Sequence, residues 1–483
     1  MKTVNLFRLN PVTLKELRQM VRSKLVSTGL IVFLFLQLAA VSIALLISRN
    51  SVHNAADLYG QGLGSSVFGT VSVLLAGVLL LGIPLFISIR MAMEKSNERM
   101  DLQFTTVLTP SQFVDGKIVS AVVLMLLFAS TSLPFLMLAY LLRGVDVFAM
   151  LRTFAFISVE AICVFYLALL VGSMNISKVF RILLMIGMVN IMIPLIGGIT
   201  AAAAFGLNDV KAWQVVVAFL MIATGCAMVR SLTAALLAPP HANSVRPLRR
   251  LVLLAWVLWG IAAASTSLVD KKIGWIFAWA LISVLISIFM LVLAVSSRPG
   301  CSRRVLSEIS RRKGMRFIQF PFFTGAENGI CFTMLMGLVS VLVFQILFQS
   351  ASYVGHDEAS MPLFLLSFFC YAGAFLLTMR LLWHALFCRF MTHKLVGIIA
   401  ILLMMLSCVL PYLLTMSDPS DRDSIAQYWP GNFAATFGDD KSEIEQYHTI
   451  VSCAWCILAA VFFLPIEIRA FAKFRPPDLN GPV

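Results

Sequence analysis

The sequence has few charged residues and no polar segment long enough to fold as a soluble domain. Asp, Glu, Lys and Arg make up 12% of the 483 residues, whereas hydrophobic residues make up 60%. This scarcity excludes a water-soluble enzyme or scaffold, because too little polar surface is available to cover so many apolar side chains. The mean hydropathy of +0.93 is typical of an integral membrane protein.

A nucleotide-binding P-loop is also missing. That loop requires Gly, four residues and then Gly-Lys-Ser/Thr, whose backbone N–H groups hold phosphates. The single Gly-Lys pair, Gly116-Lys117, is followed by Ile118, and Ser111 stands where the first Gly is required. The apolar stretches also contain no paired Asp, no Ser/His pair and no His-rich metal site. We therefore expect no catalytic residue, no metal site and no enzymatic activity in this chain.

Twelve apolar stretches, most of about 20 residues or more, alternate with short polar loops. An α-helix rises 1.5 Å per residue, so about 20 residues cross a hydrocarbon core of about 30 Å. No segment shows the alternating pattern of a membrane strand. The sequence therefore predicts an all-α, polytopic membrane protein of about 12 transmembrane helices. The predicted spans are 25–47, 67–89, 118–142, 153–173, 179–206, 213–237, 250–268, 274–296, 329–349, 362–386, 395–415 and 449–468.

The loops differ in charge on the two sides of these spans. With the N-terminus in the cytoplasm, 29 of the 37 Lys and Arg residues lie in cytoplasmic segments or at the adjoining helix ends, and 8 lie on the other side. Positive residues are retained in the cytoplasm during insertion, so we predict that both termini are cytoplasmic. The basic residues are spread over seven segments, so the net charge of +14 predicts contact with membrane lipids and no nucleic-acid partner.

A basic, Pro-containing linker at 241–249 divides the chain into two six-span units, 1–240 and 241–483. The second unit also has a long cytoplasmic loop after its second span, at about 297–328. This loop carries seven Lys and Arg residues, and we interpret it either as a second docking segment or as an anchor for lipid headgroups.

Residues 1–24 predict a short helix that lies along the cytoplasmic membrane surface. Asn10 can cap it, and Pro11 suits its first position, where a missing N–H costs nothing. Its apolar face comprises Leu14, Leu17 and Val21. Its basic face comprises Lys15, Arg18 and Arg22. The simpler alternative is an ordinary positive anchor before the first span.

The loop after the second span is the longest cytoplasmic segment of the first half. Its charged start contains Glu94, Lys95, Glu98, Arg99 and Asp101. An apolar stripe follows at Leu102, Phe104, Val107 and Leu108. Thr109-Pro110 interrupts this helical pattern, and Gly116-Lys117 leads into the third span. A short charged and apolar helix of this kind suits docking to a soluble partner, and an ordinary amphipathic connector is the alternative.

Together these two segments resemble the permease subunits of the ATP-binding-cassette (ABC) type-2 transporter family. The family's N-terminal pattern is matched by Asn10, Pro11, Lys15, Glu16, Leu17 and Arg18. Its loop pattern, Glu/Arg-rich and ending in Leu-Thr/Ser-Pro and Gly-Lys, is matched by Glu98, Arg99, Leu102, Leu108, Thr109, Pro110, Gly116 and Lys117. The chain departs from the pattern at Met100-Asp101, where members often carry Gly-Thr, and the resemblance covers mainly residues 1–240.

In such permeases the loop forms a coupling helix that contacts the ATPase, and the N-terminal segment is an interfacial elbow helix. The resemblance therefore implies the membrane-spanning subunit of an ABC transporter, an exporter, in the plasma (inner) membrane of a bacterium. It implies a separate nucleotide-binding ATPase subunit that binds ATP and magnesium, and no cofactor in this chain. A homodimer or a second permease is a further possible partner.

The chief alternative is an ion-coupled secondary transporter, which two six-span halves would also suit. Such a transporter normally needs charged residues near the bilayer midplane. The candidates within the spans are Glu160, Asn190 and Gln345, of which Glu160 is the possible intramembrane polar site, predicted in the outer half of the fourth span. Arg230 and Arg380 lie near cytoplasmic span ends, where we expect their side chains to reach the headgroup layer.

Overall fold

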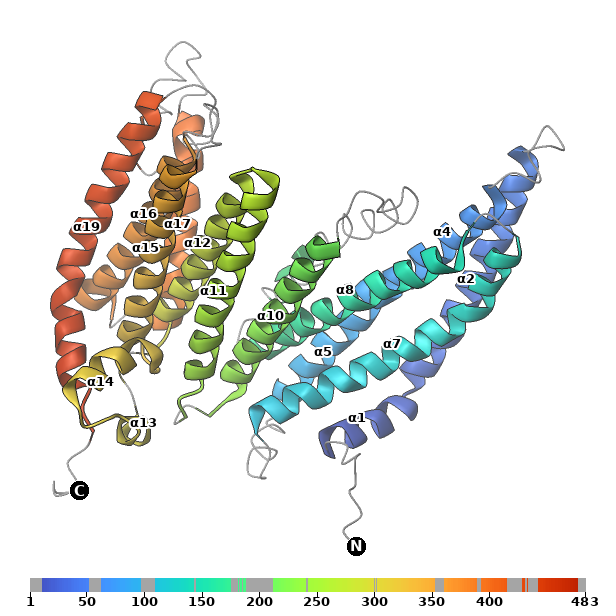
Figure 1. Cartoon of the computed structure of the whole chain (residues 1–483). Coiled ribbons are helices and arrows are strands. Elements are labelled where there is room, and N and C mark those ends of the chain that lie inside the picture. Colours follow the sequence, from blue (N-terminus) through green and yellow to red (C-terminus); the bar gives the residue numbers. More distant parts are fainter. Residues whose placement is uncertain are drawn as a thin grey trace, which may run out of the picture. The chain divides into compact units, whose positions relative to one another are not determined.

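The structure is a computed structural model in which every regular element of the described residues is a helix (Figure 1). The chain divides into two compact units, Met1–Ala238 (unit 1) and Pro239–Val483 (unit 2). The described residues are 11–51, 62–96, 109–142, 145–174, 181, 183–184, 186–187, 212–239, 242–298, 300, 302–351, 360–388, 392–414, 428–430, 432 and 442–476.

Ten of the described helices are long and apolar enough to cross a membrane, and they coincide with ten of the twelve predicted spans. The predicted span 395–415 forms a helix whose apolar part, Leu395–Pro411, is shorter than the others. The predicted span 179–206 falls mostly outside the described residues. The chain is therefore a multi-pass α-helical membrane protein, and the count of twelve and the cytoplasmic termini stay predictions.

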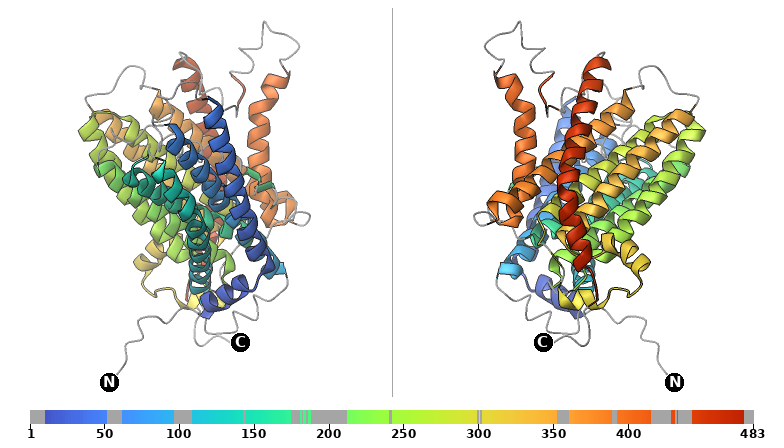
Figure 2. Two further views of the ribbon diagram at one scale, coloured as in Figure 1. Left: turned by 90° about the vertical axis from the view of Figure 1, so that its right-hand side faces the viewer. Right: turned by 90° about the vertical axis from the view of Figure 1, so that its left-hand side faces the viewer.

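Unit 1 begins with a short helix that lies crosswise at the end of the first long helix (Figure 1 and the left view of Figure 2). The second apolar helix contains a π-helical segment, η1, between α4 and α5. The bounds are α1 (Pro11–Val21), α2 (Lys24–Ser51), α4 (Gly62–Gly77), η1 (Val78–Gly82), α5 (Ile83–Ser96), α7 (Pro110–Leu141), α8 (Val147–Ser173) and α10 (Ala212–Leu237).

The described residues of unit 2 form six long helices and a folded loop with two short helices. The bounds are α11 (Val245–Asp270), α12 (Gly274–Val295), α13 (Arg303–Ser307), α14 (Lys313–Gln319), η2 (Phe320–Phe322), α15 (Ala326–Ser350), α16 (Met361–Leu382), η4 (Trp383–Phe387), α17 (His393–Leu414) and α19 (Ser442–Lys473). The loop of α13 and α14 packs on the end of α19 through Val305, Ile309, Phe320, Phe323 and Phe474 (Figure 2, right view).

Both units pack their long helices in the same order. In unit 1 the second apolar helix, α4 to α5, packs against α7 and α8, and α8 packs against α10. In unit 2 the second helix, α12, packs against α15 and α16, and α16 packs against α19. Among the described residues, the second, third, fourth and last apolar helices of each unit therefore make equivalent contacts.

Close packing within a unit relies on small residues at the contact. A Cβ atom on Gly172 of α8 would lie 2.7 Å from the Ser88 carbonyl oxygen and 2.8 Å from Met91 Cβ of α5. A side chain there would push the two backbones apart. Small residues that let backbones approach are typical of helix packing in membranes, where burial from water gives no driving force between helices.

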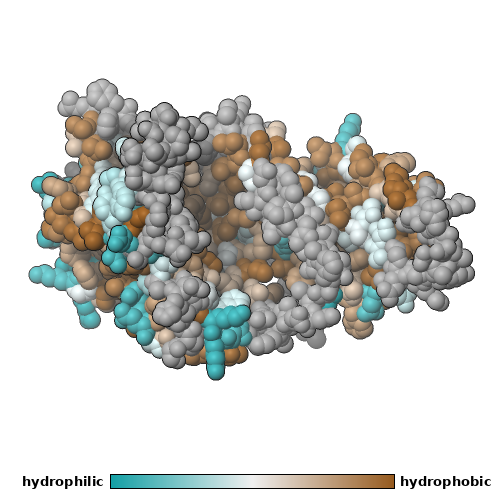
Figure 3. Space-filling model, turned by 90° about the horizontal axis from the view of Figure 1, so that it is seen from above, coloured by the Kyte–Doolittle hydropathy of each residue, from teal (hydrophilic) through white to brown (hydrophobic). Residues whose placement is uncertain are grey.

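The outward faces of the long helices carry large apolar side chains. On α2 the exposed fraction is 68% for Phe35, 55% for Leu38 and 63% for Ile47. Apolar side chains, drawn in brown, are prominent among the described residues in the view of Figure 3. Exposed apolar surface on this scale is stable only against lipid, which agrees with the membrane assignment.

Candidate functional site

Four charged side chains from three helices meet at one end of unit 1. Glu16 comes from α1, Arg90 and Glu94 come from the last turns of α5, and Lys117 comes from the start of α7. Lys117 Nζ lies 3.0 Å from Glu16 Oε1 and 2.8 Å from Glu94 Oε2. Arg90 Nη2 lies 3.0 Å from Glu16 Oε2, and Arg90 Nε lies 3.5 Å from Glu94 Oε1. Each cation therefore contacts both carboxylates, and we name this set the four-charge ring.

The four-charge ring is largely removed from solvent. The exposed fractions are 3% for the Glu16 side chain, 6% for Lys117, 17% for Glu94 and 21% for Arg90. Its formal charges cancel, which is the condition under which buried charges are tolerated. The Lys117–Glu16 contact is also a hydrogen bond, whereas the Lys117–Glu94 contact is an ion pair without hydrogen-bond alignment.

Gly116 lets α1 lie directly on α7. A Cβ atom at Gly116 would lie 2.9 Å from Val12 Cβ and 3.3 Å from the Thr13 backbone nitrogen. The Thr13 hydroxyl donates to the Gly116 carbonyl oxygen at 3.5 Å, and the Ser120 hydroxyl donates to the same oxygen at 2.9 Å. The Gly-Lys pair thus has two structural roles. Gly116 allows α1 to pack closely on α7, and Lys117 forms an ion pair with Glu16 of α1.

Helix α7 begins at Pro110, eight residues before the predicted third span, and Thr109-Pro110 marks its start. The Thr109 hydroxyl accepts a hydrogen bond from the Gln112 backbone N–H, and the Gln112 side chain accepts one from the Thr109 N–H, which completes a capping box with Pro110 at the first helical position. One turn later, Asp115 accepts two hydrogen bonds from the Arg230 guanidinium of α10. The first turns of α7 are therefore tied to α1, α5 and α10.

The predicted N-terminal helix is present as α1, Pro11–Val21. Its protein-facing side is formed by Val12, Thr13, Glu16 and Met20, which are all buried. Leu14 is 41% exposed and Leu17 is partly exposed, so the predicted apolar face is turned away from the protein. The basic residues Lys15, Arg18 and Arg22 are exposed.

Several predicted residues lie outside the described part of the chain. They are Asn10 of the N-terminal segment, the intramembrane candidate Asn190, and Glu98, Arg99, Asp101, Leu102, Phe104, Val107 and Leu108 of the loop after the second span. The structure therefore describes the two ends of this loop, at α5 and α7, and not its charged centre.

Glu160 lies at the midpoint of α8 (Val147–Ser173) and is partly exposed. Its predicted position in the outer half of the fourth span stays a prediction, and α8 begins six residues before the predicted span. Among the described residues Glu160 has no hydrogen bond and no ion pair. It remains the candidate intramembrane polar site.

Arg380 does not extend to a headgroup layer, so the sequence interpretation of this residue was wrong. Its side chain is completely buried, and its Nη1 donates to the Val295 carbonyl oxygen at 2.9 Å. Its Nη2 lies 3.5 Å from Glu327 Oε1, and its guanidinium lies 4.7 Å from the ring centroid of Trp383. Helix α12 and the start of α15 enclose Arg380. Its burial is tolerated because Glu327 neutralises its charge there.

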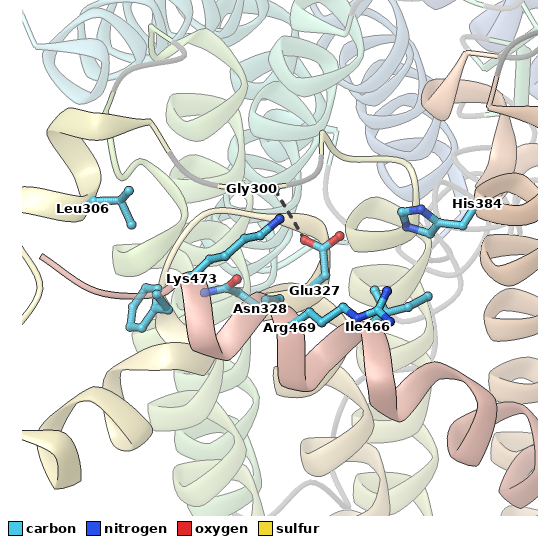
Figure 4. A pocket seen from close by; sticks show the side chains of 10 residues that line it. Gly300, Leu306, Glu327, Asn328, His384, Ile466, Arg469 and Lys473 are labelled. Carbon is cyan, nitrogen blue, oxygen red and sulfur yellow. Dashed lines mark hydrogen bonds between the residues drawn. The ribbon is translucent and has the colours of Figure 1, made fainter. Parts of the chain in front are cut away.

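A cavity of about 520 Å³ opens beside Glu327 in unit 2 (Figure 4). It is formed by the loop after α12, by α13, by the N-terminus of α15, by η4 and by the end of α19. Its polar lining consists of Glu327, Asn328, His384, Arg469 and Lys473. Within the described residues, no group of three or more His, Cys, Asp or Glu side chains is arranged to hold a metal ion.

Sequence reasoning missed Arg90, the Asp115–Arg230 pair and the Glu327–Arg380 pair. Arg90 and Glu94 are four residues apart on one helix, which is a recognisable ion-pair spacing. The other two pairs join helices distant in sequence, and no local pattern indicates them.

Comparison with protein-family models, curated proteins and solved structures finds no match to this chain.

Proposed function

We propose that this protein is the membrane-spanning permease subunit of an ABC exporter in a bacterial plasma membrane. In this proposal a separate ATPase subunit binds ATP and magnesium and hydrolyses ATP. The observation that carries the proposal is the four-charge ring, which joins the two segments that resemble the ABC type-2 family. Lys117 of the second segment contacts Glu16 of the first at 3.0 Å.

The contacts at the start of α7 suggest how ATPase movement would reach the spans. The ATPase would bind the loop around Glu98 and Arg99, and this loop leads directly into the capped start of α7 at Thr109. A displacement there acts on α1 and α5 through the four-charge ring and on α10 through Asp115 and Arg230. Packed helices with a few strong contacts move as bodies, so a small shift at the loop would change several spans together.

The matching helix order in unit 2 supports a role for the second half. If unit 2 repeats the packing of unit 1, a single chain supplies two permease halves, and the loop of α13 and α14 takes the position of the loop after the second span. The direction of transport and the bacterial plasma membrane come from the resemblance alone.

Purification of the chain from its host membranes in a mild detergent tests the proposal. We expect an ATPase with a P-loop to copurify, and we expect the charge reversal Glu98→Lys/Arg99→Glu to remove it. The matched control is Asp146→Lys/Arg152→Glu, which reverses one acid and one base at the opposite end of α7 and α8. The control should retain the ATPase.

Two results would contradict the proposal. One is copurification of equal amounts of ATPase with both double variants, which would mean that the ATPase does not bind this loop. The other is transport by the purified chain alone, driven by an ion gradient.

The second candidate function is an ion-coupled secondary transporter. The position of Glu160 at the midpoint of α8 is the observation that favours it. A carboxyl group at the midpoint of a membrane-spanning helix is expensive and is typical of ion pathways. Under this alternative, gradient-driven transport by the purified chain should be lost in Glu160→Gln. Under the permease proposal, Glu160→Gln should leave ATPase copurification unchanged.

A further inference from the structure

The cavity in unit 2 has an unbalanced set of charges. Glu327, which lines it, is already paired with Arg380 and accepts a hydrogen bond from the Gly300 backbone N–H at 3.5 Å. Arg469 and Lys473 also line the cavity, one turn apart on α19. Neither has an ion-pair partner among the described residues. The two cations are therefore available to an anion.

His384 is a third polar group that a ligand in the cavity could contact. The Nε2 atom of His384 is buried and has no hydrogen-bond partner, and His384 lines the cavity opposite α19 (Figure 4). Glu467 is a further acid at this end of α19, and it does not line the cavity. Counting Glu327, Glu467, Arg380, Arg469 and Lys473, the surroundings carry one excess positive charge with His384 neutral.

The rest of the lining is apolar. Leu306, Ile466, Ala470 and Phe474 form this part of the wall. A volume of about 520 Å³ lies within the range of about 300–1,000 Å³ usual for small-molecule sites. The cavity therefore suits a ligand that joins an anionic group to an apolar body.

The neighbouring surface resembles a membrane interface. Phe317 and Ile318 of α14 are 72% and 62% exposed, and the adjacent Arg311, Arg312 and Lys313 are exposed as well. Exposed apolar residues beside basic residues suit the boundary between acyl chains and anionic headgroups. Basic pockets between membrane helices on the cytoplasmic side bind phospholipid headgroups.

We propose that this cavity binds a phosphate ester and that the ester is the headgroup of an anionic phospholipid. Arg469 and Lys473 contact the phosphate, His384 Nε2 supplies a further polar contact, and the apolar wall receives the adjoining glycerol and acyl atoms. This site is independent of the proposed permease function. It assigns a ligand to unit 2 whether or not an ATPase binds unit 1.

The experiment uses the full chain purified in a neutral detergent. Native mass spectrometry measures binding of phosphatidylglycerol, with phosphatidylcholine as the zwitterionic reference lipid, and calorimetry measures binding of glycerol 3-phosphate. The test variant is Arg469→Gln/Lys473→Gln. The matched control is Lys271→Gln/Lys272→Gln, which removes the same charge from exposed residues that follow α11 and lie outside the cavity and its neighbouring basic surface.

We expect phosphatidylglycerol affinity to fall about thirtyfold in the test variant, since each basic residue near anionic lipid contributes about fivefold. The control should bind as the unmodified chain does. Ile466→Trp, which fills the cavity and keeps every charge, should also weaken binding. If glycerol 3-phosphate binds with the same dependence on Arg469 and Lys473 and phosphatidylglycerol does not bind, the phosphate site is supported and the lipid source is overturned in favour of a soluble ester. Equal losses in test and control variants, or binding of neither probe, would overturn the proposal.

Discussion

Lys117 and Glu16 form a buried ion pair of 3.0 Å although 101 positions separate them in the chain. The pair fixes the N-terminal helix α1 against the first turns of α7. Arg90 and Glu94 complete the contact from α5, so three helices converge on four charges.

Lys117→Met should destabilise unit 1 by about 3–5 kcal/mol. Removal of one partner from a buried pair leaves an uncompensated charge, here the carboxylates of Glu16 and Glu94. Thermal unfolding in detergent measures the change. Arg230→Gln is the control, because the Arg230–Asp115 pair is more than a third exposed and should contribute at most about 1 kcal/mol. Equal effects of the two substitutions would show that the four-charge ring contributes no special stability.

Gly116→Ala should loosen α1 from α7. The added Cβ would lie 2.9 Å from Val12 Cβ, and overpacking of this kind typically costs about 1–3 kcal/mol. We expect faster proteolysis of the segment before α2. Gly69→Ala in α4 is the matched control, since no atom beyond its own stretch of helix lies within 4 Å of the added Cβ. Unchanged cleavage in Gly116→Ala would contradict the close packing of α1 on α7.

Arg380→Met and Glu327→Gln should each destabilise unit 2, and the double variant should cost less than the sum of the two. Each single substitution leaves a buried group without its partner, whereas the double substitution removes both. A double-mutant cycle from denaturant unfolding measures the coupling. Additive losses would show that the 3.5 Å contact between Arg380 and Glu327 carries no energy.

Reporter fusions should follow the predicted sidedness. Alkaline phosphatase, which is active only outside the cytoplasm, should be active when fused after Lys271 and inactive after Arg311. Fusions after Ser177 and Asn208 test whether 179–206 crosses the membrane, and we expect inactivity at the first and activity at the second. The same activity at both positions would remove this span from the count.

The long helices could be predicted from the sequence because membrane crossing depends on the length and apolarity of a single segment. The start of α7 depends on an equally local signal, since Thr109, Pro110 and Gln112 contain the whole capping box. Contacts between helices were not predictable. Periodicity shows which residues share a helix face, but it does not show which helix covers that face.

Arg380 illustrates this limit. Its position near the end of a span predicted a side chain reaching the headgroups, yet the neighbouring helices enclose it and Glu327 neutralises it. Glu16 shows the same difficulty on α1. The sequence placed it within a matched motif, but its burial against Lys117 depends on Gly116, where the absence of a side chain allows contact.

Site-specific photocrosslinking in the host tests the central claim most directly. A photoreactive amino acid at Glu98 or Leu102 should crosslink to an ATPase that contains a P-loop, and the same probe at Lys271 should not. Crosslinks to such an ATPase from the loop alone would establish the docking site on which the permease account depends. Absence of any ATPase crosslink at Glu98 and Leu102, together with ion-driven transport by the purified chain, would contradict it.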